Sequence, residues 1–218
     1  ERVTTVQEWF IPMAPAPEII DGEDLATGRK RIVESLRART FRQFPQSPPD
    51  LNWRITQRWQ SSQAAMRRIV FVSQDGLELV GKLILPANTQ GAAKSPCLVY
   101  LRHLRSGRND AERFVGGLDD NWTRLIVNVR GVEETAWSEE QMAWHLRRAS
   151  AISGRTIASM RVYDALRALE LARALPEVDP KRIGCTGNSG GGTMTSYLMA
   201  LDERIIAAAP SCYVTNFH

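Results

Sequence analysis

From residue 66 onward, short apolar runs alternate along the chain with segments whose apolar residues recur at helical spacing. Residues 68–73 and 77–85 flank Asp75-Gly76, a pair typical of a tight turn, and predict a β-hairpin. The continuous apolar run at residues 96–101 predicts a strand that is buried on both faces. This alternation predicts an α/β protein whose twisted sheet is mostly parallel after the hairpin, with helices on both faces. Further strands are expected at 124–129, 182–186 and 205–210, and helices at 157–175 and 193–200.

The first 65 residues follow a different pattern, in which proline-rich stretches flank one amphipathic segment. Asp24 is a suitable N-cap for a helix that runs from Leu25 to about Phe41. We interpret residues 1–65 as a helical and irregular lead-in that packs on the main body, and residues 66–218 as the main α/β domain. A lid over a functional site is the alternative role for the lead-in, and we favour plain packing.

Composition and charge narrow the classes of function. The chain has 218 residues, of which 43% are hydrophobic and 24% are charged, as in ordinary globular proteins. The net charge of +4 is spread over basic clusters that stand among acidic residues, so we expect no nucleic-acid partner. The sequence contains no apolar run of membrane-spanning length, and we expect no membrane span.

The three cysteines, Cys97, Cys185 and Cys212, each stand in or beside a predicted core strand. We expect them to be unpaired and largely buried, because a free cysteine behaves as a small hydrophobic residue. They provide no disulfide framework and do not fix the compartment.

A secreted or periplasmic location is favoured over a cytoplasmic one, and we expect neither a metal ion nor another cofactor.

The glycine-rich stretch at residues 183–192 carries the candidate chemistry. Gly187-Asn188-Ser189-Gly190-Gly191 has the G-x-S-x-G pattern and stands between a predicted strand and a predicted helix. On such a turn the strained backbone points the serine hydroxyl into solvent, and side chains two residues to either side would clash. The N–H of Gly190 lies at the helix N-terminus, where it can bind a developing oxyanion. Ser189 is therefore the candidate nucleophile.

Other glycine-rich turns compete with this interpretation. A strand-to-helix turn without chemistry has the same sequence pattern. A phosphate-binding loop needs a lysine and then Ser or Thr after its last glycine, and Thr193-Met194 does not provide them. A dinucleotide-binding fingerprint belongs to the first strand of a sheet, not to one this late in the chain. The succession of helix, strand, turn, helix and strand favours the nucleophile.

The run from Asp179 to Gly184, together with Ser189-Gly190-Gly191, resembles the α/β-hydrolase superfamily. The sequence is similar to the branch that holds acetyl xylan esterases, dienelactone-hydrolase-like esterases and the catalytic domains of prolyl oligopeptidase-type peptidases. The resemblance runs from about Arg67 to the last residue. It implies an α/β-hydrolase fold and a serine ester hydrolase that acts through an acyl-enzyme on a small-molecule or carbohydrate ester.

The resemblance also implies a second oxyanion donor in the loop after Leu101. The family usually has His-Gly there, and this sequence has Arg102-His103-Leu104. The backbone N–H of Leu104 is the first candidate for the donor, and that of His103 is the second.

Two charged features near the strand-to-helix turn at residues 187–191, called the elbow below, are interpreted as structural. The run at residues 128–131 resembles the Asp-x-Arg-Gly run of related enzymes, which implies that Arg130 ties loops together near the site. Asp164 and Arg167 stand three residues apart on a predicted helix, and we expect them to form a structural pair.

The base and the acid of a serine triad have no clear source in this chain. In this fold they follow the serine on later strands, and only residues 190–218 follow Ser189. His103 precedes the elbow, His145 stands in a predicted helix, and His218 is the last residue. We therefore expect the N-terminal part of a larger hydrolase, with its fold incomplete at the C-terminal end. The acid and the histidine then come from sequence beyond residue 218, and either this remainder or a second copy is the expected partner.

Two further functions stay open. A non-catalytic hydrolase-fold module is the alternative from another class, and a prolyl oligopeptidase-type serine peptidase is the alternative among enzymes. The intact glycines around Ser189 favour an enzyme, because a dead site need not retain an exposed serine. The peptidase usually has a β-propeller before the hydrolase domain, and the lead-in is too short for one.

Overall fold

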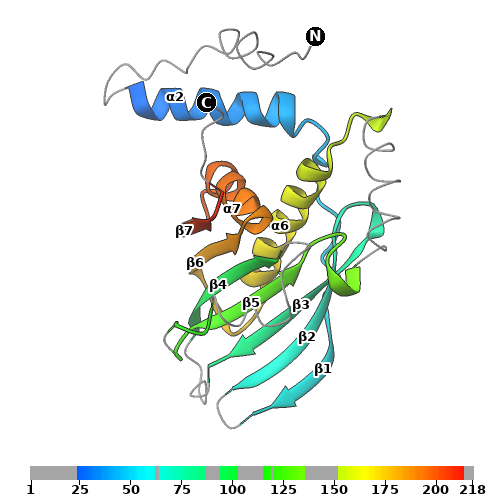
Figure 1. Cartoon of the computed structure of the whole chain (residues 1–218), viewed down its shortest axis with the longest axis vertical. Coiled ribbons are helices and arrows are strands. Elements are labelled where there is room, and N and C mark those ends of the chain that lie inside the picture. Colours follow the sequence, from blue (N-terminus) through cyan, green and yellow to red (C-terminus); the bar gives the residue numbers. More distant parts are fainter. Residues whose placement is uncertain are drawn as a thin grey trace, which may run out of the picture. The chain divides into compact units, whose positions relative to one another are not determined.

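The computed structural model describes residues 24–61, 64–86, 94–102, 115–118, 120–135 and 152–213 (Figure 1). The chain divides into two compact units, Glu1–Arg42 and Gln43–His218. The first unit contains helix α2 (Asp24–Ser35), which continues into a π-helical turn, η2 (Leu36–Thr40). The predicted helix is confirmed, although it begins at Asp24 itself. The packing of residues 1–65 and the domain boundary at residue 66 stay predictions.

The second unit is built around one seven-stranded sheet, ordered β1-β2-β3-β5-β4-β6-β7 (Figure 1). Its first four strands in this order pair antiparallel, and β5, β4, β6 and β7 then pair parallel. The sheet is therefore mostly parallel beyond the hairpin, as the sequence predicted. The strands are β1 (Arg54–Gln60), β2 (Ala65–Val72), β3 (Glu78–Leu85), β4 (Ser95–Arg102), β5 (Thr123–Asn128), β6 (Val178–Asn188) and β7 (Ile205–Ser211).

The predicted hairpin is formed by β2 and β3. Their ladder pairs Val72 with Glu78, and the short 3-10 turn η3 (Gln74–Gly76) joins them. Asp75 and Gly76 both have left-handed backbones, with φ of 59° and 75°. The tight turn that the sequence predicted at Asp75-Gly76 is therefore confirmed.

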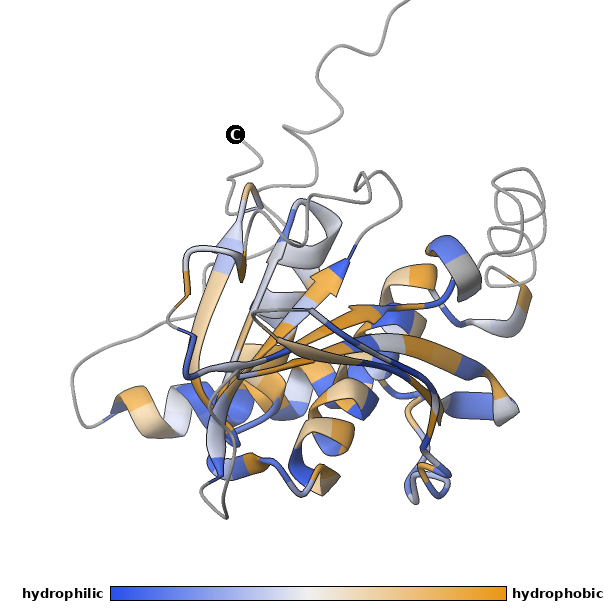
Figure 2. Ribbon diagram, turned by 90° about the horizontal axis from the view of Figure 1, so that it is seen from below, coloured by the Kyte–Doolittle hydropathy of each residue, from blue (hydrophilic) through white to orange (hydrophobic). Residues whose placement is uncertain are grey.

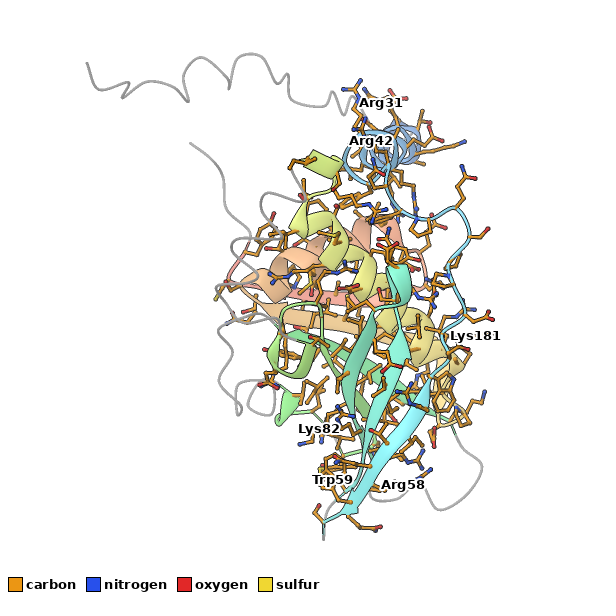
Figure 3. The ribbon with its side chains drawn as sticks, turned by 90° about the vertical axis from the view of Figure 1, so that its right-hand side faces the viewer. Arg31, Arg42, Arg58, Trp59, Lys82 and Lys181 are labelled. Atoms are coloured by element: carbon orange, nitrogen blue, oxygen red, sulfur yellow. The ribbon has the colours of Figure 1, made fainter. Side chains whose placement is uncertain are left out.

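Strand β1 lies inside the segment predicted as a lead-in, and the sequence pattern does not indicate it. Its residues are almost all exposed, so it lacks the alternation of a half-buried strand. The ladder with β2 and an ion pair between Arg54 and Glu78, at 2.7 Å, hold it at the sheet edge. Figure 3 shows Arg58 and Trp59 at the far end of this strand. Charged side chains on an edge strand disfavour pairing with another chain.

Two helices cover one face of the sheet. Helix α6 (Ile157–Ala174) and helix α7 (Gly190–Leu201) pack on each other and on β6, so they share that face. Thr156 and Ser159 form a capping box at the start of α6. Apolar residues gather along the central strands and on the helices packed against them (Figure 2). Of the segment between β4 and β5, the structure describes residues 115–118 and 120–122.

The described residues also bear on metal and membrane binding. They contain no group of three histidine, cysteine or acidic side chains arranged to hold a metal ion. Among the helices of the described ranges, none combines the length and the apolar character that crossing a bilayer requires.

Candidate active site

Ser189 stands at a sharp turn between the last residue of β6 and the first residue of α7. Its backbone has φ 53° and ψ −112°, and its side chain is exposed. A non-glycine residue held in such a sparsely populated conformation costs about 1–3 kcal/mol, and such strain clusters at functional sites. The prediction of a strained strand-to-helix turn is confirmed.

The two glycines of the motif are required by close packing of the backbone. A Cβ atom on Gly187 would lie 2.6 Å from the carbonyl carbon of Gly191. A Cβ atom on Gly191 would lie 2.2 Å from the carbonyl oxygen of Leu101, on the neighbouring strand β4. Both distances are shorter than any real contact, and both partners are backbone atoms that cannot rotate away. The elbow therefore fits against the sheet only with glycine at these positions.

Gly190 begins α7 directly after the serine. The first N–H groups of a helix have no acceptor within the helix, and the helix dipole makes this end positive. The carbonyl of Ser189 is already engaged, since it accepts the N–H of Thr193 at 2.9 Å. Because Gly190 is the first residue of α7, its N–H remains the candidate for one half of an oxyanion hole.

The second predicted oxyanion donor falls on residues that the structure does not describe. His103 and Leu104 both lie outside the described residues, so their role stays a prediction. The strand before them is well placed, because the parallel register sets Leu101 opposite Gly187 of β6. Strand β4 therefore ends, at Arg102, at the same carboxyl edge of the sheet as Ser189.

The ion pair between Arg102 and Glu133 at this edge was not predicted from the sequence. Arg102, the last residue of β4, donates to the carboxylate of Glu133 at 2.6 Å, and the two side chains are 8% and 33% exposed. Asn128, at the end of β5, donates to the same carboxylate at 3.4 Å. Glu133 itself has a left-handed backbone with φ 44°. A buried strand that ends in arginine was the available signal, since a charge there needs a partner.

The second buried pair differs from the one predicted. Asp164 is fully buried and accepts the Nε and Nη2 groups of Arg130, both at 2.8 Å, together with the hydroxyl of Ser73 at 2.5 Å. Arg167 pairs instead with Glu170. The predicted Asp164–Arg167 pair is therefore wrong, because the carboxylate faces the loop after β5 and not along its own helix.

The cysteine prediction is right for two residues and wrong for the third. Cys97 and Cys185 are free and buried, and burial raises the pKa of each thiol to about 12. Cys212 is also free but is exposed, because it follows the last residue of β7 and turns away from the strand with φ 54°. None of the three is paired.

All three histidines lie outside the described residues, so the structure assigns none of them to Ser189. The backbone N–H of His103 therefore stays the second candidate for the oxyanion donor, as a prediction. What the described residues bring together is part of the predicted site. This part consists of the exposed Ser189, the helix N-terminus behind it, and the carboxyl edge of β4 beside it.

The fold and this site define a class of protein. A strand order with antiparallel β1 to β3, a crossover that sets β5 between β3 and β4, and a strained serine between β6 and α7 are those of an α/β-hydrolase. Within this class, the family model described as acetyl xylan esterase (AXE1) matches residues 39–218. The chain belongs to that family.

Individual relatives agree with the family. The hydrolase-like protein YtaP of Bacillus subtilis (strain 168) is 26% identical over 148 residues, which cover 62% of this chain and 48% of the relative. A candidate acetyl xylan esterase from Bacteroides fragilis NCTC 9343 has a similar fold, with a TM-score of 0.68 at 15% identity, over 84% of this chain and 52% of that one.

The acetyl xylan esterase from Paenibacillus sp. R4 is also similar in fold, with a TM-score of 0.58 at 18% identity. The match covers 95% of this chain and 63% of that one. At these identities the likeness shows the fold alone. The chain thus spans about half to two thirds of the length of these three proteins.

Proposed function

We propose that the whole protein is a serine ester hydrolase and that Ser189 is its nucleophile. The observation that carries this proposal is the strained, exposed backbone turn at Ser189, between two glycines that close packing requires. A turn that costs free energy persists only where the surrounding structure enforces it. Membership of the acetyl xylan esterase family favours an acetylated carbohydrate as the substrate.

The proposed reaction is an acyl transfer through Ser189. The Ser189 hydroxyl attacks the ester carbonyl and gives its proton to a base, which produces a tetrahedral oxyanion. The N–H of Gly190 stabilises this oxyanion, together with a second donor from Leu104 or His103. The intermediate collapses to an acyl-enzyme and releases the alcohol, which takes the proton from the base. Water then attacks the acyl-enzyme and releases the acid and the free serine.

The base and its orienting acid belong, in this proposal, to sequence that follows residue 218. The fact that supports it is the length of the relatives, of which this chain covers 48% and 52% in the two matches above. The part that follows residue 218 is then the functional partner of the described sheet. No metal ion or cofactor takes part in these steps.

The test compares Ser189→Ala with wild type in the full-length protein. Turnover is measured on p-nitrophenyl acetate and as acetate release from acetylated xylan, and Ser196→Ala on the same helix is the matched control. Ser189→Ala is expected to leave only the residual acceleration of about 10³–10⁴-fold over water that binding and an oxyanion hole provide. Unchanged turnover in Ser189→Ala would refute the proposal and favour a non-catalytic module. Release of acetate from xylan with no cleavage of peptide substrates would separate the esterase from the peptidase.

A further inference from the structure

The third glycine after the serine, Gly192, is not part of the G-x-S-x-G pattern. A Cβ atom there would lie 2.4 Å from the carbonyl oxygen of Ser211 and 3.0 Å from the Cβ of Tyr213. The first of these partners is a backbone atom of the neighbouring strand β7. Gly192 therefore permits an approach of this carbonyl to the start of α7 that any other residue would block.

The carbonyl that Gly192 admits is bonded to the nucleophile. The N–H of Ser189 donates to the carbonyl oxygen of Ser211 at 2.9 Å. The parallel ladder of β6 and β7 ends with Asn188 opposite Ser211, so this bond extends the ladder by one residue onto the serine. The strained turn is thus tied directly to the end of β7.

The chain turns sharply directly after Ser211. Cys212 has a left-handed backbone with φ 54°, although it is not glycine, and its side chain is exposed. A second strained residue, one position from the carbonyl that holds Ser189, needs a structural reason of its own. Its conformation ends β7 at the position that leaves the Ser211 carbonyl facing the elbow.

We propose that Gly192, the Ser211 carbonyl and the turn at Cys212 form a clamp that positions Ser189 for ester hydrolysis. This proposal rests on the proposed function of Ser189. In it, the bond to the Ser189 N–H fixes the orientation of that peptide, and therefore the direction of the hydroxyl relative to the N–H of Gly190. Gly192 and Cys212 are positioning residues, because they act through the backbone of the serine and not on the substrate.

The first test is Gly192→Ala in the full-length protein, with Gly184→Ala as its matched control. A Cβ atom on Gly184 would also meet a β7 carbonyl, that of Ala207 at 3.2 Å, but far from the elbow. A misplacement near 1 Å lowers rates by about 100-fold, so we expect a kcat loss of about this size for Gly192→Ala. KM is expected to stay unchanged, because the transition state is affected and substrate binding is not. Gly184→Ala is expected to keep kcat.

A second pair of variants keeps the proposal testable if Gly192→Ala does not fold. Cys212 is exposed, so its replacement leaves the core intact. Cys212→Ile disfavours the left-handed turn and is expected to lower kcat well below that of Cys212→Gly, which favours the turn. The rate of phosphonylation of Ser189 by a p-nitrophenyl phosphonate provides a second readout, and we expect it to fall in parallel with kcat.

Equal kcat values for Cys212→Ile and Cys212→Gly would overturn the clamp, as would equal losses for Gly192→Ala and Gly184→Ala. A change in KM alone would also overturn it. These failures differ from a failure of the proposed function. In that case the wild-type turnover itself would not depend on Ser189.

Discussion

Removal of the Asp164 carboxylate is expected to destabilise the fold strongly. This side chain is fully buried and accepts the backbone N–H of Arg130 at 3.0 Å in addition to its guanidinium, which is 11% exposed. Burial lowers the pKa of Arg161, and the charge of Asp164 opposes this effect. Asp164→Ala would therefore leave two guanidinium groups without this counter-charge, and the hydroxyl of Ser73 without this acceptor.

The size of the loss follows from the burial. Removing one partner of a buried, hydrogen-bonded ion pair typically costs about 3–5 kcal/mol, and we expect Asp164→Ala to fall in this range. A small globular protein has only about 5–15 kcal/mol of total stability, so urea denaturation of the full-length protein will show a large shift of the midpoint. Asp164→Asn is expected to lose less, because the amide retains an acceptor of similar shape.

The matched control is Glu78→Ala. Glu78 pairs with Arg54 at 2.7 Å, as close as the Asp164 pair, but the two side chains are 50% and 52% exposed. Solvent screens such a pair, so we expect little change in the urea midpoint. If Asp164→Ala shifted the midpoint no more than Glu78→Ala does, burial would not determine the strength of these pairs, and the reasoning would be refuted.

Two further predictions concern the thiols and the sheet edge. Cys97 and Cys185 stay protonated because burial raises their pKa values to about 12. Of these three cysteines, Ellman's reagent should therefore react quickly with the exposed Cys212 and slowly with the other two. Because these pKa values lie above the ordinary value of 9.0, the free energy of unfolding should fall as pH rises from 9.0 toward about 12, as urea titrations at several pH values will show. Ile206 on β7, the last strand of the described sheet, is 63% exposed, so residues 1–218 alone should self-associate in size-exclusion chromatography with light scattering. Ile206→Lys in the same residues 1–218 should reduce this association. A monomeric mass for residues 1–218 both with and without this substitution would contradict the prediction.

The sequence predicted those features that depend on neighbouring residues. The apolar run of β4 and the glycine spacing around Ser189 are local signals, and both led to the observed elements. Strand β1 was missed because almost all of its residues are exposed, and the ladder with β2 is what makes it a strand. The partner of Asp164 was wrong because Arg130 lies 34 positions away, beyond the reach of helical spacing.

The strain at Ser189 is enforced from three neighbouring strands at once. Close packing of Gly191 against the Leu101 carbonyl fixes the elbow to β4, and the bond from the Ser189 N–H to the Ser211 carbonyl fixes it to β7. Strand β6 lies between β4 and β7 and ends directly before the serine. These contacts all come from backbone atoms of a rigid sheet, so they offset the strain of about 1–3 kcal/mol without any contribution from a base or an acid. The placement of the proposed nucleophile is therefore a property of the sheet, and in the proposed function the residues that activate it are supplied by a separate part of the protein.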